Sequence, residues 1–219
     1  MIDVLEYILP DAARATESHL AIAGGGQPLF VWQDMPNKRI WEIKGSAGFP
    51  WDSFSYDEQL VYQSITEQNW TSPTTFKMFA SKSWPKGNGG IVWCPRYFTP
   101  GTPNMAIITA DSTYRIYPSC GVFTTATLGG PIATHIEGPY QIDFGGSLGL
   151  QSALVQTYYW GPELSNIEVN YYVQGFGHVQ WELWNLVNGL FVQKQVSAFN
   201  TQVDGGTPAL NFPCGVPVI

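Results

Sequence analysis

Residues 167–197 read IEVNYYVQGFGHVQWELWNLVNGLFVQKQVS, and this stretch decides the fold. Three segments in it, 167–174, 179–184 and 190–197, alternate apolar and polar side chains. A period of two is typical of half-buried strands, because successive side chains of a strand point to opposite faces. The intervening residues 175–178 and 185–189 are rich in Gly and Asn, which favour turns. The stretch therefore predicts a three-stranded antiparallel meander.

The rest of the chain extends this pattern. Short β-rich segments separated by Gly, Pro, Asn and Asp lie at 91–94, 105–110, 113–117, 121–125, 140–144 and 154–160. Segments 28–33 and 39–44 predict a hairpin with a turn at 35–38. Helices are predicted at 2–9 and 12–18, at 54–68, where Ser55 and Glu58 have capping-box spacing, and from Ser72-Pro73 onward.

Together these segments predict a mainly β chain that folds as one domain over residues 1–219. We expect an antiparallel β-sandwich of the jelly-roll kind, because many short strands separated by turn signals favour that architecture. Two or three short helices and a hairpin fall in residues 1–80, and residues 87–219 form the β-rich part.

Composition excludes several classes of protein. Charged residues make up 12% of the 219, about half the ~25% usual for soluble domains, whereas aromatics make up 15%. A disordered chain would show the opposite balance. The net charge of −7 argues against nucleic-acid binding, which needs clustered Lys and Arg. No apolar run approaches the ~18 residues of a transmembrane helix.

The meander carries the pattern with most functional content. In the register we expect, Asn170 lies opposite Glu182 and Tyr172 opposite Gln180, so one face presents amides, carboxylates and aromatic rings. Sugars need that mixture, since amides and carboxylates bind hydroxyls and rings cover the C–H side. The alternative is the ordinary solvated side of an antiparallel sheet. The candidate ligand-binding residues are Asn170, Tyr172, Gln174, Gln180, Trp184, Gln193 and Gln195.

Two carboxylates on the same predicted face, Glu168 and Glu182, suggest a catalytic pair. The expected register makes them diagonal neighbours, about 7–8 Å apart at Cα. Glycosidases hold two carboxyl groups roughly 5–9.5 Å apart, so the spacing suits catalysis. It suits two surface glutamates equally well, and whether the protein is an enzyme stays open.

A second candidate site combines His135, Glu137 and Asp143, since imidazole and carboxylates ligate metals. His135 as an ordinary loop histidine is the alternative. The glycines at 145–149 form neither a phosphate-binding loop nor a nucleophile elbow, because no Lys-Ser/Thr and no helix follow. The sequence predicts no cofactor.

Cysteine usage and processing signals bear on location. Cys94, Cys120 and Cys214 permit one disulfide, and the sequence does not choose among the three pairings. Asn69-Trp70-Thr71 matches a glycosylation acceptor, a pattern that also recurs by chance. Residues 1–10 lack the basic region and the long apolar core of a signal peptide, so we expect either a cytoplasmic protein or one whose leader is absent from this chain. Low charge and abundant Gly, Thr and Trp favour an extracellular or periplasmic protein, and a cytoplasmic location stays open.

Three functions follow as expectations. The first is a secreted protein that binds a carbohydrate or another neutral polar ligand, with a possible role in polysaccharide processing. The second is a subunit of a shell, capsid or surface layer, for which an oligomer is expected. The third is a metal-dependent hydrolase or lyase built on His135, Glu137 and Asp143.

Overall fold

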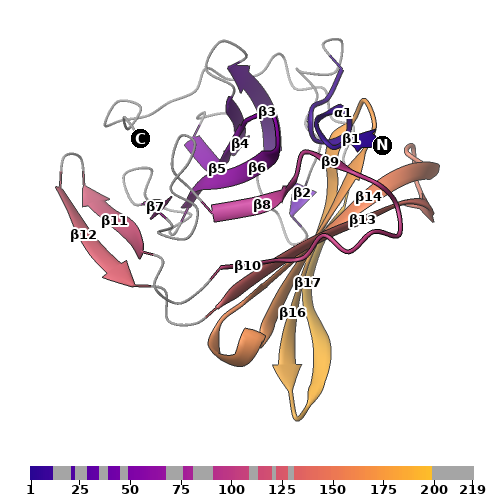
Figure 1. The fold of residues 1–219 in the computed structure, drawn as a ribbon. Coiled ribbons are helices and arrows are strands. Elements are labelled where there is room, and N and C mark those ends of the chain that lie inside the picture. Colours follow the sequence, from indigo (N-terminus) through magenta and orange to yellow (C-terminus); the bar gives the residue numbers. More distant parts are fainter. Residues whose placement is uncertain are drawn as a thin grey trace.

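The computed structural model describes residues 1–11, 21–22, 29–34, 39–44, 49–67, 76–80, 91–108, 113–119, 122–127 and 131–198. Within these ranges the chain is mainly β, and its strands pair antiparallel in a seven-stranded, an eight-stranded and a two-stranded sheet (Figure 1). The prediction of a mainly β, antiparallel protein is confirmed.

The seven-stranded sheet contains the predicted meander, which is confirmed as β15–β16–β17. β13 and β14 form a long hairpin beside it. In spatial order the strands are β10 (Ala106–Ile108), β13 (Ile132–Asp143), β14 (Leu150–Trp160), β15 (Asn166–Val173), β16 (Gly177–Val187), β17 (Leu190–Ala198) and β2 (Ala21–Ile22).

The eight-stranded sheet is built largely from the first half of the chain. Its order is β12 (Val122–Thr127), β11 (Thr113–Ser119), β7 (Phe76–Ala80), β6 (Leu60–Glu67), β5 (Phe49–Tyr56), β4 (Arg39–Lys44) and β3 (Leu29–Asp34), with β8 (Ile91–Pro95) paired to β6 off this path. The predicted hairpin at 28–33 and 39–44 is confirmed as β3–β4.

The two large sheets share one hydrophobic core, and β8 lies where they meet. β8 pairs with β6 and also contacts β10 and β13 of the other sheet. Its residues Ile91, Val92, Trp93 and Cys94 are all buried, which explains the continuous apolar run in the sequence. The centroid of the Trp93 ring lies 5.3 Å from the centroid of the Phe54 ring and 5.3 Å from that of the Tyr158 ring.

The N-terminus docks on the meander. β1 (Ile2–Asp3) pairs with β9 (Tyr97–Phe98), and the four-residue helix α1 (Leu5–Ile8) follows. The backbone N–H of Asp11 donates to the carbonyl of Gly175 at 2.9 Å, so the segment after α1 closes over the β15–β16 turn. η2 (Pro162–Leu164), a single 3₁₀ turn, connects β14 to β15.

The helix predicted at 54–68 is wrong, because these residues form the β5–β6 hairpin. Asp57 Oδ1 accepts the backbone N–H groups of Gln59 at 2.7 Å and Leu60 at 2.8 Å. An Asp that bonds the backbone ahead of it makes a turn that competes with a helix. The Ser55–Glu58 spacing, which resembles a capping box, therefore belongs to a turn between strands.

The other helix predictions have mixed outcomes. Only the four residues of α1 are helical within 2–9. Phe76 and Phe79, expected on a helix, lie on strand β7. The segments 12–18 and 72–75 and the Asn69 acceptor lie outside the described residues. The β-sandwich of the jelly-roll kind stays a prediction.

Cys94 is a free, buried thiol, so a disulfide to Cys94 is not formed. Burial raises the pKa of this thiol, which therefore stays protonated at neutral pH. Cys120 and Cys214 lie outside the described residues. In the part of the chain that is described, no helix is both long and apolar enough to cross a membrane.

Gly138 lies in β13 at a point where the backbone of β14 comes very close. Its φ is +110°, and an added Cβ would lie 2.8 Å from the carbonyl oxygen of Ala153 and 3.1 Å from the backbone nitrogen of Tyr140. Gly138→Ala should lower the free energy of unfolding by about 2 kcal/mol or more, since it combines a strained φ with a backbone clash. Urea unfolding measures the change.

Gly101→Ala is the matched control. Gly101 also has a positive φ, +79°, yet no atom lies within 4 Å of an added Cβ. This variant should lose only about 1 kcal/mol, the cost of the backbone conformation. Equal losses in the two variants would contradict the close approach at Gly138.

Candidate functional site

The register between β15 and β16 determines which side chains can form a site. Val169 pairs with Glu182, Asn170 with Trp181 and Tyr171 with Gln180. The expected pairing of Asn170 with Glu182 and of Tyr172 with Gln180 is therefore wrong. A bulge between Tyr171 and Tyr172 shifts the register. Because side chains alternate, a shift of one residue moves a whole strand's polar set to the other face.

The predicted ligand face is consequently divided between the two sides of the seven-stranded sheet. Glu168, Asn170 and Tyr172 point toward the shared core, whereas Gln180, Glu182 and Trp184 point to the opposite, outer side. Asn170 and Tyr172 are 4% and 1% exposed, so neither can meet a ligand at the surface. The prediction that Glu168 and Glu182 share a face is wrong for the same reason.

On the inner side the polar residues bond to one another. Trp181 Nε1 donates to Glu168 Oε2 at 2.9 Å. Asn170 Nδ2 donates to Gln156 Oε1 at 2.8 Å, and Gln156 Nε2 reaches the Trp93 carbonyl at 3.5 Å. This inner network stabilises the contact between the sheets, since buried polar groups are costly unless they are hydrogen-bonded.

Glu168 is the only carboxylate of the inner network. Burial raises the pKa of Glu168, and this effect outweighs the hydrogen bonds from Trp181 and Trp160 and the nearby His178, which lower it. Glu168 therefore gains a proton more readily than an exposed glutamate does. Its neighbour Tyr158 has a pKa raised well above the ordinary value, mainly by burial and then by the charges of Glu168 and Asp52.

On the outer side, four residues form what we call the Glu182 cluster: Tyr171, Gln180, Glu182 and Trp184. Glu182 Oε1 accepts Tyr171 Oη–H at 3.1 Å and Gln180 Nε2–H at 2.8 Å. Its Oε2 accepts Trp184 Nε1–H at 2.8 Å. Glu182 is buried, whereas the three donors are half-buried. One carboxylate thus holds three side chains in fixed orientations.

Burial and the charge of Glu182 keep the Tyr171 hydroxyl in its protonated, hydrogen-bond-donating form. Burial, followed by the charge and the hydrogen bond of Glu182, raises the pKa of Tyr171, so its hydroxyl remains a donor at neutral pH. The cluster contains no cation, and neutral N–H and O–H groups solvate its one carboxylate. Direct pairing places Tyr159, Ile167 and Val169 on the same face. The surface therefore combines fixed hydrogen-bonding groups with aromatic and aliphatic ones.

The remaining predicted ligand residues are dispersed. Gln193 is exposed and pairs with Trp184, which places it next to the Glu182 cluster. Gln195 pairs with Leu183 on the other face, because a second bulge lies between Leu183 and Trp184. Gln174 directly follows β15, in the turn to β16, and donates from Nε2 to Glu6 Oε2 at 3.1 Å.

The predicted metal ligands do not form a cluster. His135 and Glu137 both point to the outer side of β13, and Asp143 is at the far end of that strand. Glu137 Oε2 accepts the hydroxyl of Tyr140 at 2.8 Å. Among the residues that the structure describes, no three His, Cys, Asp or Glu side chains come close enough to hold a metal ion.

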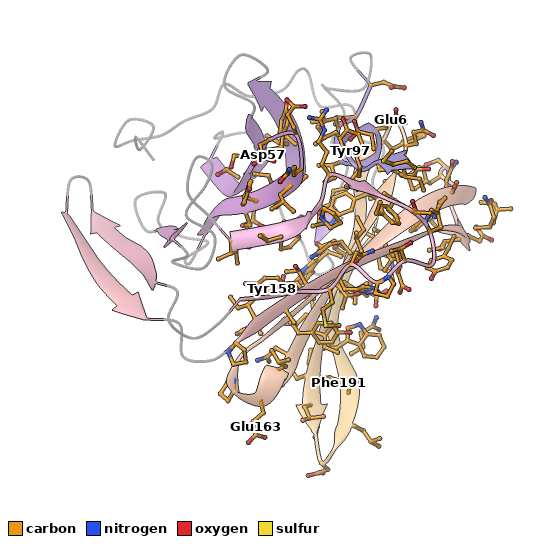
Figure 2. The ribbon with its side chains drawn as sticks, in the orientation of Figure 1. Glu6, Asp57, Tyr97, Tyr158, Glu163 and Phe191 are labelled. Atoms are coloured by element: carbon orange, nitrogen blue, oxygen red, sulfur yellow. The ribbon has the colours of Figure 1, made fainter. Side chains whose placement is uncertain are left out.

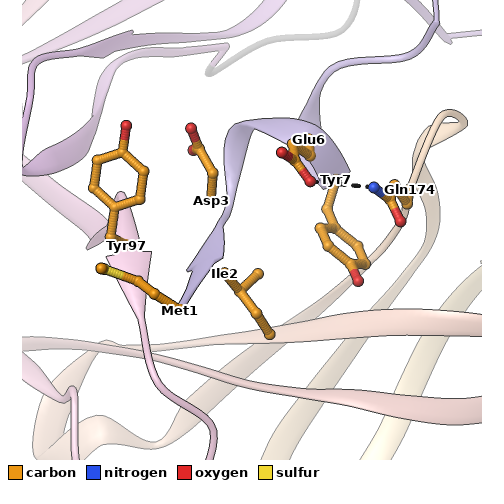
Figure 3. Close-up of a pocket in the computed structure, with 7 residues that line it drawn as sticks. All are labelled: Met1, Ile2, Asp3, Glu6, Tyr7, Tyr97 and Gln174. Carbon is orange, nitrogen blue, oxygen red and sulfur yellow. Dashed lines mark hydrogen bonds between the residues drawn. The ribbon is translucent and has the colours of Figure 1, made fainter.

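A pocket that no sequence pattern predicts lies at the N-terminus (Figure 3). It encloses about 320 Å³ and is lined by Met1, Ile2, Asp3, Glu6, Tyr7, Tyr97 and Gln174. Arg96 borders it and donates to Asp3 Oδ2 at 3.4 Å, with its guanidinium 4.9 Å from the centre of the Tyr97 ring. Its walls come from three separate parts of the chain, which no local pattern brings together.

Sequence reasoning also missed Tyr171, which the alternation assigned to the apolar side of β15. Its hydroxyl was the available signal, because a half-buried Tyr hydroxyl usually finds a hydrogen-bond partner.

Comparisons with known proteins find no matching family model, no similar curated protein and no similar solved structure. The candidate sites therefore depend on their geometry alone.

Glu168→Gln tests the ionisation inside the inner network. A folded-state pKa above the unfolded value means that ionising Glu168 opposes folding as the pH rises through that window. The glutamine of this variant keeps an oxygen acceptor for Trp181 and does not ionise. The variant should therefore gain stability relative to the wild type as the pH increases from about 4 to 7. Thermal unfolding across this range measures the difference.

Glu163→Gln is the control, because Glu163 is exposed on η2. It removes the same charge without a buried environment, so its profile is the reference for the loss of one exposed negative charge. If Glu168→Gln followed the same profile as this control, burial of Glu168 would have no effect on its ionisation.

Proposed function

We propose that this protein binds a carbohydrate, or another neutral ligand rich in hydroxyl groups, on the outer face of β15–β16. The observation that carries the proposal is the bonding of Tyr171, Gln180 and Trp184 to the single carboxylate of Glu182. An extracellular or periplasmic location suits this function, and the low charge of the chain agrees with it.

Orientation is the first argument for binding. The Trp184 N–H donates to Glu182 Oε2, so rotation of the indole would break that bond. A ring with a fixed orientation can stack on the C–H face of a sugar with little loss of conformational entropy. Gln180 is held in the same way through Nε2, which leaves its Oε1 available as an acceptor for a hydroxyl.

Charge is the second argument, and it limits the ligand class. The Glu182 carboxylate is buried and already accepts three hydrogen bonds. A cationic ligand would have to displace these donors to reach it. An anionic ligand would meet a carboxylate without a compensating cation in the cluster. A neutral polyol avoids both costs, since it exchanges hydrogen bonds with half-buried amides and hydroxyls.

Binding without hydrolysis is the activity we propose for this face. A glycosidase aims two carboxyl groups at one glycosidic bond. Glu168 and Glu182 point to opposite faces of the sheet, so they do not form such a pair here.

Trp184→Ala should weaken binding to the preferred polysaccharide at least tenfold, the effect of losing about 1.4 kcal/mol. Gln180→Ala should weaken it as well, because a hydroxyl loses its partner. Binding is measured by glycan array and by pull-down on insoluble polysaccharides, followed by titration calorimetry with a soluble fragment. Circular dichroism checks that each variant is folded.

Trp181→Phe is the matched control. Trp181 also donates its indole N–H to a glutamate, but on the inner face. This variant should keep full affinity. Tyr97→Ala examines the N-terminal pocket as the competing site. Loss of binding in Tyr97→Ala with retention in Trp184→Ala would move the site to that pocket, and no binding to any polysaccharide would reject the proposal.

The second function, an assembly subunit, draws on a different observation. Half of the large hydrophobic side chains that are exposed in the described residues lie on the β16–β17 hairpin, at Leu186, Val187, Leu190, Phe191, Val192 and Val196. Single exposed apolar residues are ordinary, but contiguous patches usually mark interaction sites.

A further inference from the structure

The β16–β17 hairpin extends beyond the eight-stranded sheet and exposes apolar side chains on both of its faces. Figure 1 shows its tip projecting from the rest of the drawn ribbon, and Figure 2 labels Phe191 there. Leu186 pairs with Phe191, and Val187 with Leu190, so the two pairs point in opposite directions. Leu190 is 71% exposed.

The inward-facing side chains near the tip of the hairpin are apolar, like those of a hydrophobic core. Val187, Leu190 and Val192 continue the face that carries Trp181 and Leu183 nearer the shared core. Near the tip no strand of the described part of the eight-stranded sheet lies opposite them, and all three are exposed. A solvated tip would normally carry polar residues at these positions. Their composition therefore suggests burial against another molecule.

Among the described strands, the outer edge of β17 is paired over only a small part of its length. β2 pairs only with Ser197 and Ala198, and no other described strand pairs with the Leu190–Val196 edge on that side. An open strand edge offers backbone N–H and C=O groups to another strand. Natural proteins usually protect such edges with charges, yet residues 190–197 contain a single one, Lys194.

We propose that the β16–β17 hairpin is a self-association surface, on which the β17 edge of one copy pairs antiparallel with the β17 edge of a second copy. Antiparallel pairing of two identical edges satisfies a two-fold axis, because each residue makes the same contact in both directions. In this arrangement the two hairpins lie side by side with their tips pointing in opposite directions, so the Leu190 end of each β17 packs beside the Val196 end of the other.

Apolar contact supports a second copy. The six exposed apolar side chains lie on both faces of the hairpin, so pairing of two β17 edges would bring apolar side chains of the two copies next to one another on each face. Backbone pairing along β17 adds directional hydrogen bonds to this apolar contact.

Charge distribution supports the same occupant. The chain carries a net charge of −7, which opposes self-association in general. Residues 183–197 contain only Lys194 as a charge, whereas Glu6 and Asp57 lie at the opposite end of the molecule (Figure 2). Pairing through the hairpins thus joins the two molecules along segments that each carry one charged side chain. An anionic membrane is disfavoured, because it would require a basic surface around the tip.

The test is the mass of the full chain in solution, measured by sedimentation velocity at about 10–100 µM. The wild type should have twice the chain mass of 24.3 kDa. The double variant Leu190→Lys, Phe191→Lys should sediment as a monomer, with a dissociation constant raised at least tenfold. Both positions are exposed, so the fold should persist, and circular dichroism verifies this.

Leu150→Lys is the matched control. Leu150 is 64% exposed on β14 of the same sheet, outside the hairpin, and this variant should remain dimeric. A monomeric wild type at 100 µM would overturn the proposal, and so would a dimer that survives the double substitution. Flotation of a monomeric wild type with zwitterionic phosphatidylcholine vesicles would also overturn it, because a lipid surface would then be the occupant. Loss of dimerisation leaves polysaccharide binding unaffected, which keeps the two proposals distinguishable.

Discussion

The register of β15 against β16 is the constraint on which the rest of the seven-stranded sheet depends. A bulge at Tyr171/Tyr172 lets Tyr172 pair with His178 while Tyr171 pairs with Gln180. This offset sends Glu168 to the core and Glu182 to the outer face. Each carboxylate then meets an indole N–H, from Trp181 and Trp184 respectively. Without the bulge, Trp181, Glu182 and Trp184 would exchange faces relative to β15, so Glu168 would lose Trp181 as its partner and would face the same side as Glu182.

Much of the strand content could be predicted from local patterns. The two-residue alternation identified the meander and the β3–β4 hairpin, and the Asn188-Gly189 pair, with φ of 52° and 80°, forms the turn between β16 and β17. The 54–68 segment misled because Leu60, Val61 and Ile65 fit a helical face as well as a strand. Asp57 decides the outcome through its side-chain bonds to the backbone, a choice that periodicity does not encode.

The site was less predictable, for a reason that is geometrical. All of its residues except Tyr171 were identified as polar strand positions, but their grouping required a register. Placing the turn one residue differently changes which amides and carboxylates share a face. The N-terminal pocket could not be predicted for a second reason, the distance in sequence between the residues that line it. Glu6 and Gln174 bond across 168 positions of sequence, and only the docking of α1 on the β15–β16 turn brings them together.

The scarcity of charged residues in this chain is also reflected in the hydrogen-bond partners of two carboxylates of the seven-stranded sheet. Glu168 and Glu182 are both held by neutral donors, where many proteins would place Lys or Arg. Neutral donors leave the surface around Glu182 without a strong field, which favours uncharged ligands over ions. The same scarcity of charge leaves Lys194 as the one charged side chain of β17. One compositional property therefore underlies both surfaces: few charges leave neutral hydrogen-bond donors on the outer face and apolar side chains on the hairpin.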